Sequence, residues 1–216
     1  MTRLPKQLAL ARRSGWGGAR EGAGRKRKDG QAGPGVPHLR RAPLDARCPV
    51  HVTLKVRNAV GSLRRPGCVE ALRSAFLAIR LKQARRGKLR VVHFAILSNH
   101  LHLIVEAPDR TALSRGLQAL EIRMARALNA SLKRTGPVFA DRFHAHILKT
   151  PTEVSRARRY VLENAAIHAA RAGQPPGPRH GLSSVTMADC ASSPGTWLLS
   201  TGWRRARHSG SVQTAG

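Results

Sequence analysis

The fold is decided by residues 89–107, whose sequence is LRVVHFAILSNHLHLIVEA. Two apolar runs, 89–97 and 100–107, stand on either side of the polar dipeptide Ser98-Asn99. Short apolar runs rich in β-branched residues indicate strands, and a polar dipeptide between two of them is typical of a tight turn. The stretch therefore predicts a β-hairpin.

Patterns on both sides of the hairpin extend this prediction to a domain. Alternating apolar residues predict strands, and apolar residues every three or four positions predict helices. The predicted elements are a strand at 50–56, a helix at 68–86, the hairpin, a helix at 109–133, a strand at 138–148 and a helix at 150–171. The last helix opens with a capping-box pattern formed by Thr150 and Glu153. The order βαββαβα predicts an α+β, ferredoxin-like fold, a four-stranded antiparallel sheet with helices on one face, flanked by basic flexible tails.

The charge of the chain indicates a polyanionic partner. Its 216 residues include 39 Lys and Arg and 11 Asp and Glu, so the formal net charge is +28. This charge excludes cationic partners and favours nucleic acid, although a nonspecific basic protein has the same composition. We expect no membrane span, because no apolar run approaches about 18 residues. Three widely spaced cysteines match neither a disulfide framework nor a zinc motif, which favours a cytoplasmic protein.

The composition divides the chain into three segments. Residues 1–48 lack periodic apolar residues and are predicted to be a basic flexible arm. Residues 49–172 hold all the predicted elements and are predicted to form the folded domain, in which we look for a catalytic site. Residues 173–216 are predicted to be a linker and a basic tail, in which Trp197 and Trp203 dock a short helix either onto the domain or onto DNA. The arm contains a basic run that is suited to a phosphate backbone, formed by Arg25, Lys26, Arg27 and Lys28.

Four polar residues form the candidate active site. His100 and His102 are two positions apart on a strand, so both point to one face and can share a metal ion. Tyr160, the only tyrosine, and Asn164 are four apart on a predicted helix and share a side. A tyrosine oxygen can attack a DNA phosphodiester when a divalent ion polarises the phosphate. Imidazole and amide ligands suit Mn²⁺ better than Mg²⁺.

Two stretches resemble a known family. They are VVHFAILSNHLHLIVEA at 91–107 and GPVFADRFHAHILKTPTEVSRARRYVLENAAIHAAR at 136–171. Both are similar to the single-tyrosine HUH transposases, in particular the REP-associated type, in which HUH denotes two histidines around a hydrophobic residue. The resemblance covers residues 50–171. One difference is Ala165, because the family often has proline after the asparagine, and this difference concerns the helix end and the hairpin contacts.

The resemblance implies a function for each matched position. His100, His102 and Asn164 would bind Mg²⁺ or Mn²⁺, and Tyr160 would be the nucleophile, giving a 5′-phosphotyrosine link and a free 3′-hydroxyl. The substrate would be single-stranded DNA beside a hairpin, so we expect a nucleoid-associated transposase, either a monomer or a homodimer. We expect DNA contacts from the arm and from the basic residues Arg142, Arg156 and Arg159.

Several alternatives stay open. His144 and His146 form a second His-x-His pair that is a weaker candidate for the metal. Glu106 shares a face with the first pair and is either an extra ligand or, as we favour, an exposed carboxylate. At the level of function, the alternatives are an inactive or domesticated DNA-binding protein and an initiator of replication or conjugation. An RNA-recognition module is disfavoured, because Phe94 is the only aromatic residue on the hairpin strands.

Overall fold

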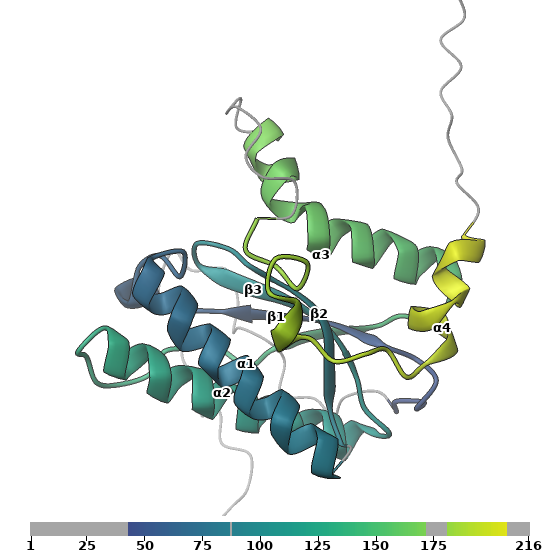
Figure 1. The fold of residues 1–216 in the computed structure, drawn as a ribbon, viewed down its shortest axis with the longest axis horizontal. Helices are drawn as coiled ribbons and strands as arrows, with labels where there is room; N and C mark the ends of the chain where they lie inside the picture. The colour runs from purple at the N-terminus through teal and green to yellow at the C-terminus, as the bar shows by residue number, and fades with distance from the viewer. Residues whose placement is uncertain (1–42, 87, 172–180, 207–216) are drawn as a thin grey trace, which may run out of the picture. The chain divides into compact units, whose positions relative to one another are not determined.

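The computed structural model describes residues 43–86, 88–171 and 181–206, and it has the predicted order of elements. The domain consists of β1 Val50–Lys55, η1 Asn58–Val60, α1 Pro66–Arg86, β2 Arg90–Ile96, β3 His100–Glu106, α2 Arg110–Ser131, β4 His144–Ile147 and α3 Pro151–Arg171. The C-terminal segment adds η2 Ala188–Cys190, α4 Trp197–Ser200 and η3 Gly202–Arg205 (Figure 1). The predicted α+β fold class is therefore confirmed. The N-terminal arm up to residue 42 lies outside the described residues.

The sheet has the strand order β2-β3-β1-β4, and all three neighbouring pairs are antiparallel. The predicted hairpin joins β2 to β3. Leu97 N donates to His100 O over 3.0 Å and closes the turn around Ser98 and Asn99. Because β1 pairs with β3, residues 51 and 53 are brought beside His102.

The fourth strand is shorter than predicted. We expected it at 138–148, but β4 spans His144–Ile147. The first part of this stretch pairs with the residues that follow β1 through an isolated bridge between Val56 and Phe139. The chain then bends at Asp141, whose Oδ1 accepts a hydrogen bond from Arg142 N over 2.7 Å. An aspartate that bonds the neighbouring backbone in this way competes with strand pairing, which accounts for the interruption.

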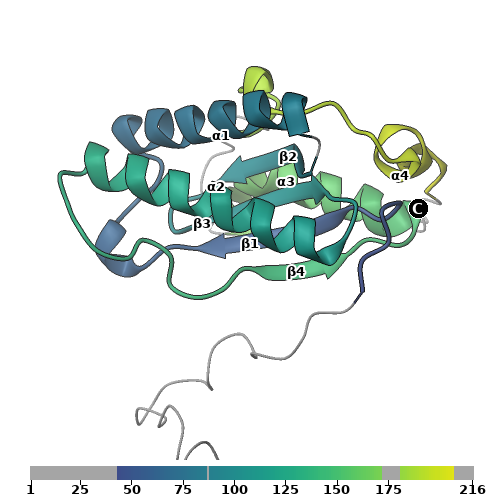
Figure 2. The same cartoon turned by 90° about the horizontal axis from the view of Figure 1, so that it is seen from below.

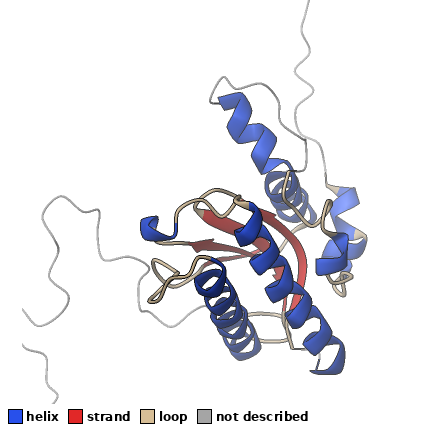
Figure 3. Ribbon diagram, turned by 60° about the vertical axis from the view of Figure 1, so that its left-hand side comes forward, coloured by secondary structure: helices blue, strands red, loops and turns tan. Residues whose placement is uncertain are grey.

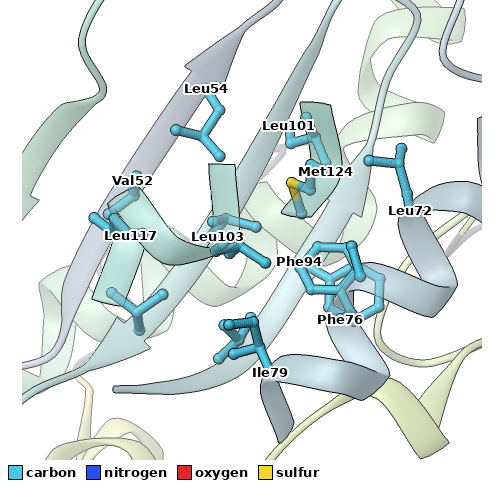
Figure 4. Close-up of a cluster of buried hydrophobic side chains, with 14 of the residues drawn as sticks. Val52, Leu54, Leu72, Phe76, Ile79, Phe94, Leu101, Leu103, Leu117 and Met124 are labelled. Atoms are coloured by element: carbon cyan, nitrogen blue, oxygen red, sulfur yellow. The ribbon is translucent and has the colours of Figure 1, made fainter. Parts of the chain in front are cut away.

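The main core lies between one face of the sheet and the helices α1 and α2 (Figure 4). Phe76 of α1 stacks on Phe94 of β2, with ring centroids 4.2 Å apart. The helix α2 can approach closely because Gly116 has no side chain, and a Cβ there would lie 2.6 Å from Leu89 Cβ. The predicted apolar stripe of α2 is confirmed as buried and consists of Leu113, Leu117, Leu120, Met124 and Leu128.

The position of α3 differs from the prediction. Helices were expected on one face, and α1 and α2 do share a face, but α3 covers the opposite one (Figures 2 and 3). The reason is a second apolar patch on that face, where Ala95 and Ile104 pack with Val154 and Val161 of α3. The histidines of β3 point to this same face, so α3 lies over them.

The C-terminal segment docks onto the domain. Ile96 N donates to Leu182 O over 2.8 Å, and Ser184 N donates to Phe94 O over 2.9 Å, so this segment pairs with β2. The helix α4 then contacts α3, and Leu199 is buried in the smaller core. Of the two expectations for the tail, docking of a short helix onto the domain is the one observed. Residues 172–180 and 207–216 lie outside the described residues.

The described helices include none that is both long enough and apolar enough to cross a membrane. The cysteines Cys48, Cys68 and Cys190 are all free thiols.

Candidate active site

The two histidines of β3 converge as the strand pattern predicts. His100 and His102 project from the same face of β3, and their Nε2 atoms are 3.1 Å apart. His102 is 5% exposed, whereas His100 is only half-buried. On the other side of the His100 ring, Nδ1 lies 2.7 Å from Asn99 Oδ1, which fixes the orientation of this imidazole. Two nitrogens at this separation can share a proton or ligate one cation, because adjacent ligands at about 2.1 Å from an ion lie about 3 Å apart.

Two residues of β1 contact the Nδ1 side of His102, and neither was predicted from the sequence. His102 Nδ1 lies 3.2 Å from His51 Nε2 and 3.1 Å from Thr53 Oγ1. Burial, together with the nearby His146, lowers the pKa of His51 to about 4. The alternation in residues 50–56 already placed His51 and Thr53 on one face. What was missing was the register that sets Thr53 opposite His102.

Tyr160 lies over this histidine cluster. Its ring centroid is 5.0 Å from that of His102 and 6.0 Å from that of His51, and both contacts are edge-on. The side chain is 37% exposed, so Tyr160 is accessible to solvent while its ring contacts the histidines. The predicted nucleophile and the predicted ligand pair thus meet within a single chain.

Asn164, one turn further along α3, is an unusual buried amide. The residue is 0% exposed, and neither Oδ1 nor Nδ2 has a hydrogen-bond partner among the described residues. Buried polar atoms are nearly always paired, so an unpaired amide requires an explanation such as an ion or water. An oxygen held ready in this way fits the metal-ligand role expected for Asn164.

The start of α3 fixes where these residues lie. Glu153 N donates to Thr150 Oγ1 over 3.2 Å, and Glu153 Oε2 accepts from the backbone N of Lys149 at 2.6 Å and of Thr150 at 3.2 Å. The predicted capping box is therefore confirmed. It satisfies free N–H groups at the first turn. It also fixes the residue at which α3 begins, and therefore the positions of Tyr160 and Asn164 along the helix.

Glu106 was expected to be either an extra metal ligand or an exposed carboxylate, and the structure shows a different role. It is 4% exposed, so the prediction of an exposed carboxylate is wrong. Its Oε1 and Oε2 accept hydrogen bonds from the backbone N of Thr196 and Gly195, at 2.8 and 2.7 Å. The Glu106 carboxylate therefore binds the C-terminal segment, and it lies at the opposite end of β3 from His100.

The second histidine pair lies on the edge strand β4. His144 and His146 are both exposed and stand opposite Thr53 and His51. Within the described ranges, no group of three or more His, Cys, Asp or Glu side chains is arranged to hold a metal. A metal held at the β3 pair would therefore take its third protein ligand from a residue of another type, and Asn164 is the candidate for that position.

The predicted DNA-contacting residues are only partly described. Arg142, Arg156 and Arg159 are exposed, the last two on α3 beside Tyr160. The run Arg25, Lys26, Arg27 and Lys28 lies outside the described residues, so its role stays a prediction.

The site combines a strand with two converging histidines and a helix with a partly exposed tyrosine. The family model described as "Transposase IS200 like" matches residues 48–164, more than half of the chain. The chain belongs to this family, and it is a transposase.

The comparison with solved structures gives similar but distant folds. A REP-associated tyrosine transposase bound to a REP hairpin is 15% identical, with a TM-score of 0.49, over 74% of this chain and 93% of that one. A putative transposase from Deinococcus radiodurans is 14% identical, with a TM-score of 0.39, over 68% of this chain and 99% of that one. Among curated proteins, no significant match was found.

Proposed function

We propose that this transposase cleaves and rejoins single-stranded DNA beside hairpins, with Tyr160 as the nucleophile. The observation that carries the proposal is the position of the Tyr160 ring, 5.0 Å from the His102 ring in the same chain. An accessible tyrosine beside two converging imidazoles is suited to phosphoryl transfer, in which positioning and charge stabilisation supply most of the rate.

The chemistry conserves the energy of the phosphodiester. The Tyr160 oxygen attacks phosphorus and loses its proton, while the bond to the 3′ oxygen breaks and that oxygen takes up a proton. The products are a 5′-phosphotyrosine and a free 3′-hydroxyl. Rejoining is the reverse step, in which a 3′-hydroxyl attacks the phosphotyrosine and releases Tyr160.

A divalent cation fits the residues present. His100 and His102 would hold it through Nε2 and Asn164 through Oδ1, an atom that is otherwise buried without a partner among the described residues. Two nitrogen ligands and one oxygen favour Mn²⁺ over Mg²⁺. The ion would polarise a phosphoryl oxygen and stabilise the charge that develops during attack. His51 and Thr53 orient the His102 ring for this task.

The DNA path is proposed from charge and exposure. Arg156 and Arg159 are exposed on the helix that carries Tyr160, and Arg142 is exposed just before β4. These side chains, with the basic arm, would bind backbone phosphates and give strongly salt-dependent binding. The proposal of a DNA hairpin as the target is based on the sequence resemblance. The proposal of a nucleoid location is based on DNA as the substrate. Because the Tyr160 ring lies beside the His51 and His102 rings of its own chain, we propose that one copy supplies both the nucleophile and the histidine pair.

A denaturing-gel assay tests the proposal. Labelled single-stranded hairpins from the sequence that flanks the gene are incubated with the protein and Mn²⁺, Mg²⁺ or EDTA. Wild type should form a covalent adduct in Mn²⁺ but not in EDTA, and Tyr160→Phe and His100→Ala/His102→Ala should form none. The variant His144→Ala/His146→Ala is the matched control and should keep the activity.

The outcomes separate the proposal from its alternatives. An adduct with Tyr160→Phe would show that another residue is the nucleophile. Loss of the adduct only in the His144→Ala/His146→Ala variant would move the metal site to β4. Tight hairpin binding by wild type without any adduct would favour the domesticated DNA-binding protein.

A further inference from the structure

The segment formed by residues 195–205, which we name the C-terminal clamp, is fastened to the end of β3 by a buried carboxylate. Glu106 Oε2 accepts from Gly195 N over 2.7 Å. Its Oε1 accepts from the backbone N of Thr196 over 2.8 Å and from the Thr196 hydroxyl over 2.7 Å. Arg90 lies 3.5 Å from Oε2 and supplies a positive charge. Gly195 lies against the Arg90 guanidinium, so a side chain at position 195 would require Arg90 to move.

From this attachment the clamp runs onto the helix that carries Tyr160. Thr196 Oγ1 accepts from Leu199 N over 3.3 Å and so caps α4. Leu198 and Leu199 are 8% and 2% exposed and belong to the same small core as Val154 and Val161 of α3. The clamp therefore contributes apolar contacts to the interface that holds α3 against the sheet.

The far end of the clamp holds one particular side chain of α3. The centroid of the Trp203 ring lies 3.7 Å from the Arg158 guanidinium carbon, and Arg158 Nε donates to His93 Nε2 of β2 over 3.1 Å. A guanidinium between an indole face and a neutral imidazole gains from both contacts. Arg158 is thus fixed between the clamp and the edge of the sheet at β2.

Arg158 and Tyr160 lie on opposite flanks of α3. At 3.6 residues per turn, two positions correspond to about 200° around the helix axis. The buried residues Val154, Ala157 and Val161 fall between the two flanks. Fixing Arg158 over β2 therefore sets the rotation of α3 that turns Tyr160 toward His102.

We propose that the C-terminal clamp positions the nucleophile: by holding Arg158, it sets the rotation of α3 at which Tyr160 meets the histidine pair. The proposal rests on the proposed function only for its effect on cleavage. The clamp residues act on Tyr160 through Arg158 and the small core, so they are positioning residues.

The single tyrosine makes a direct measurement possible. Full-length protein labelled with 3-fluorotyrosine gives one fluorine NMR resonance, from residue 160. Two variants loosen the clamp, Trp203→Leu, which removes the indole face, and the milder Thr196→Val, which removes the hydroxyl donor. The matched control is Ile79→Val in the main core, which lowers stability without touching α3. In each protein we measure the resonance, the melting temperature, hairpin affinity and the single-turnover rate of adduct formation.

We expect both clamp variants to shift or broaden the Tyr160 resonance and to slow adduct formation at least about tenfold, because small misplacements of a nucleophile have large rate effects. Hairpin affinity should stay within about twofold of wild type, and Ile79→Val should change neither resonance nor rate.

Two results would overturn the proposal: an unchanged resonance and rate in both clamp variants, or an equal loss of rate in Ile79→Val. A displaced resonance in a protein whose wild type forms no adduct would support the clamp and count against the proposed function, so the two can fail separately.

Discussion

Replacing Asn164 with Leu should raise the stability of the metal-free protein and abolish cleavage. The wild-type amide is 0% exposed, and both its polar atoms lack a hydrogen-bond partner among the described residues. Such an amide lowers stability, because it has given up its bonds to water without replacing them. Leu keeps the branching at Cγ and has no polar atom to satisfy, but it has no oxygen for a metal.

The size of the effect follows from three contributions. An unsatisfied buried polar group costs about 1–3 kcal/mol, so removing this amide gains about 2 kcal/mol. Leu is a better helix former than Asn, by about 0.5 kcal/mol. Its greater volume in a packed site costs about 1 kcal/mol. The net gain is about 1.5 kcal/mol, which for a domain of this size raises Tm by roughly 3–6 °C.

Thermal unfolding, followed by circular dichroism in EDTA and in Mn²⁺, measures the effect. In Mn²⁺, wild type should gain stability from binding, and Asn164→Leu should gain less. Asn164→Asp is the matched control, because it buries an unpaired carboxylate. It should melt below wild type in EDTA and recover in Mn²⁺. A lower Tm for Asn164→Leu than for wild type in EDTA would refute the argument that the amide is unsatisfied, and retained cleavage would refute its role as a ligand.

Three further predictions concern DNA binding, pH and the start of α3. The double variant Arg156→Ala/Arg159→Ala should make the slope of log affinity against log salt less steep by about 1.4, because each phosphate contact on a single strand contributes about 0.7. Fluorescence anisotropy in a KCl series measures this slope, and an unchanged slope would show that neither residue binds the DNA backbone. Burial, and then the charge of Arg158, lower the pKa of His93 to about 4. Between the two pKa values the unfolded chain binds more protons at His93 than the folded chain does. The free energy of unfolding is therefore highest above about pH 6.5 and falls as the pH drops toward about 4. Urea unfolding at about pH 7 and about pH 4.5 should show this loss and a smaller one in His93→Gln, and equal losses would contradict it. Thr150→Ala should destabilise the protein by about 1 kcal/mol through loss of the cap, and an unchanged urea midpoint would show that the cap is redundant.

The sequence predicted the elements well where side-chain periodicity carries the information. The hairpin and the two crossover helices appear within a few residues of their predicted ends. The length of β4 was not predictable from its apolar pattern, because the bend before it involves a local hydrogen bond of Asp141 rather than apolar residues. The side of the sheet that α3 covers was also missed. That choice depends on Ala95 and Ile104, whose burial on the second face becomes apparent only when the strands are paired.

For the site, too, periodicity predicted some features, and others depend on contacts between distant segments. The strand period alone predicted that His100 and His102 converge, and the helix period placed Tyr160 with Asn164. The roles of His51 and Thr53 depend on the register between β1 and β3, which one sequence does not contain. The function of Glu106 depends on a partner about ninety residues away, at Gly195 and Thr196.

The most direct test of the account is to identify the residue and the phosphate end in the covalent product. After reaction of the wild-type protein with a labelled hairpin strand in Mn²⁺, trypsin should release a peptide covering 160–171, in which Tyr160 is the only residue with a hydroxyl group. We expect mass spectrometry to find the nucleotide 5′-phosphate on this peptide, and we expect the other DNA product to have a 3′-hydroxyl that a polymerase can extend. DNA attached to any other peptide, or joined through a 3′-phosphate, would contradict it.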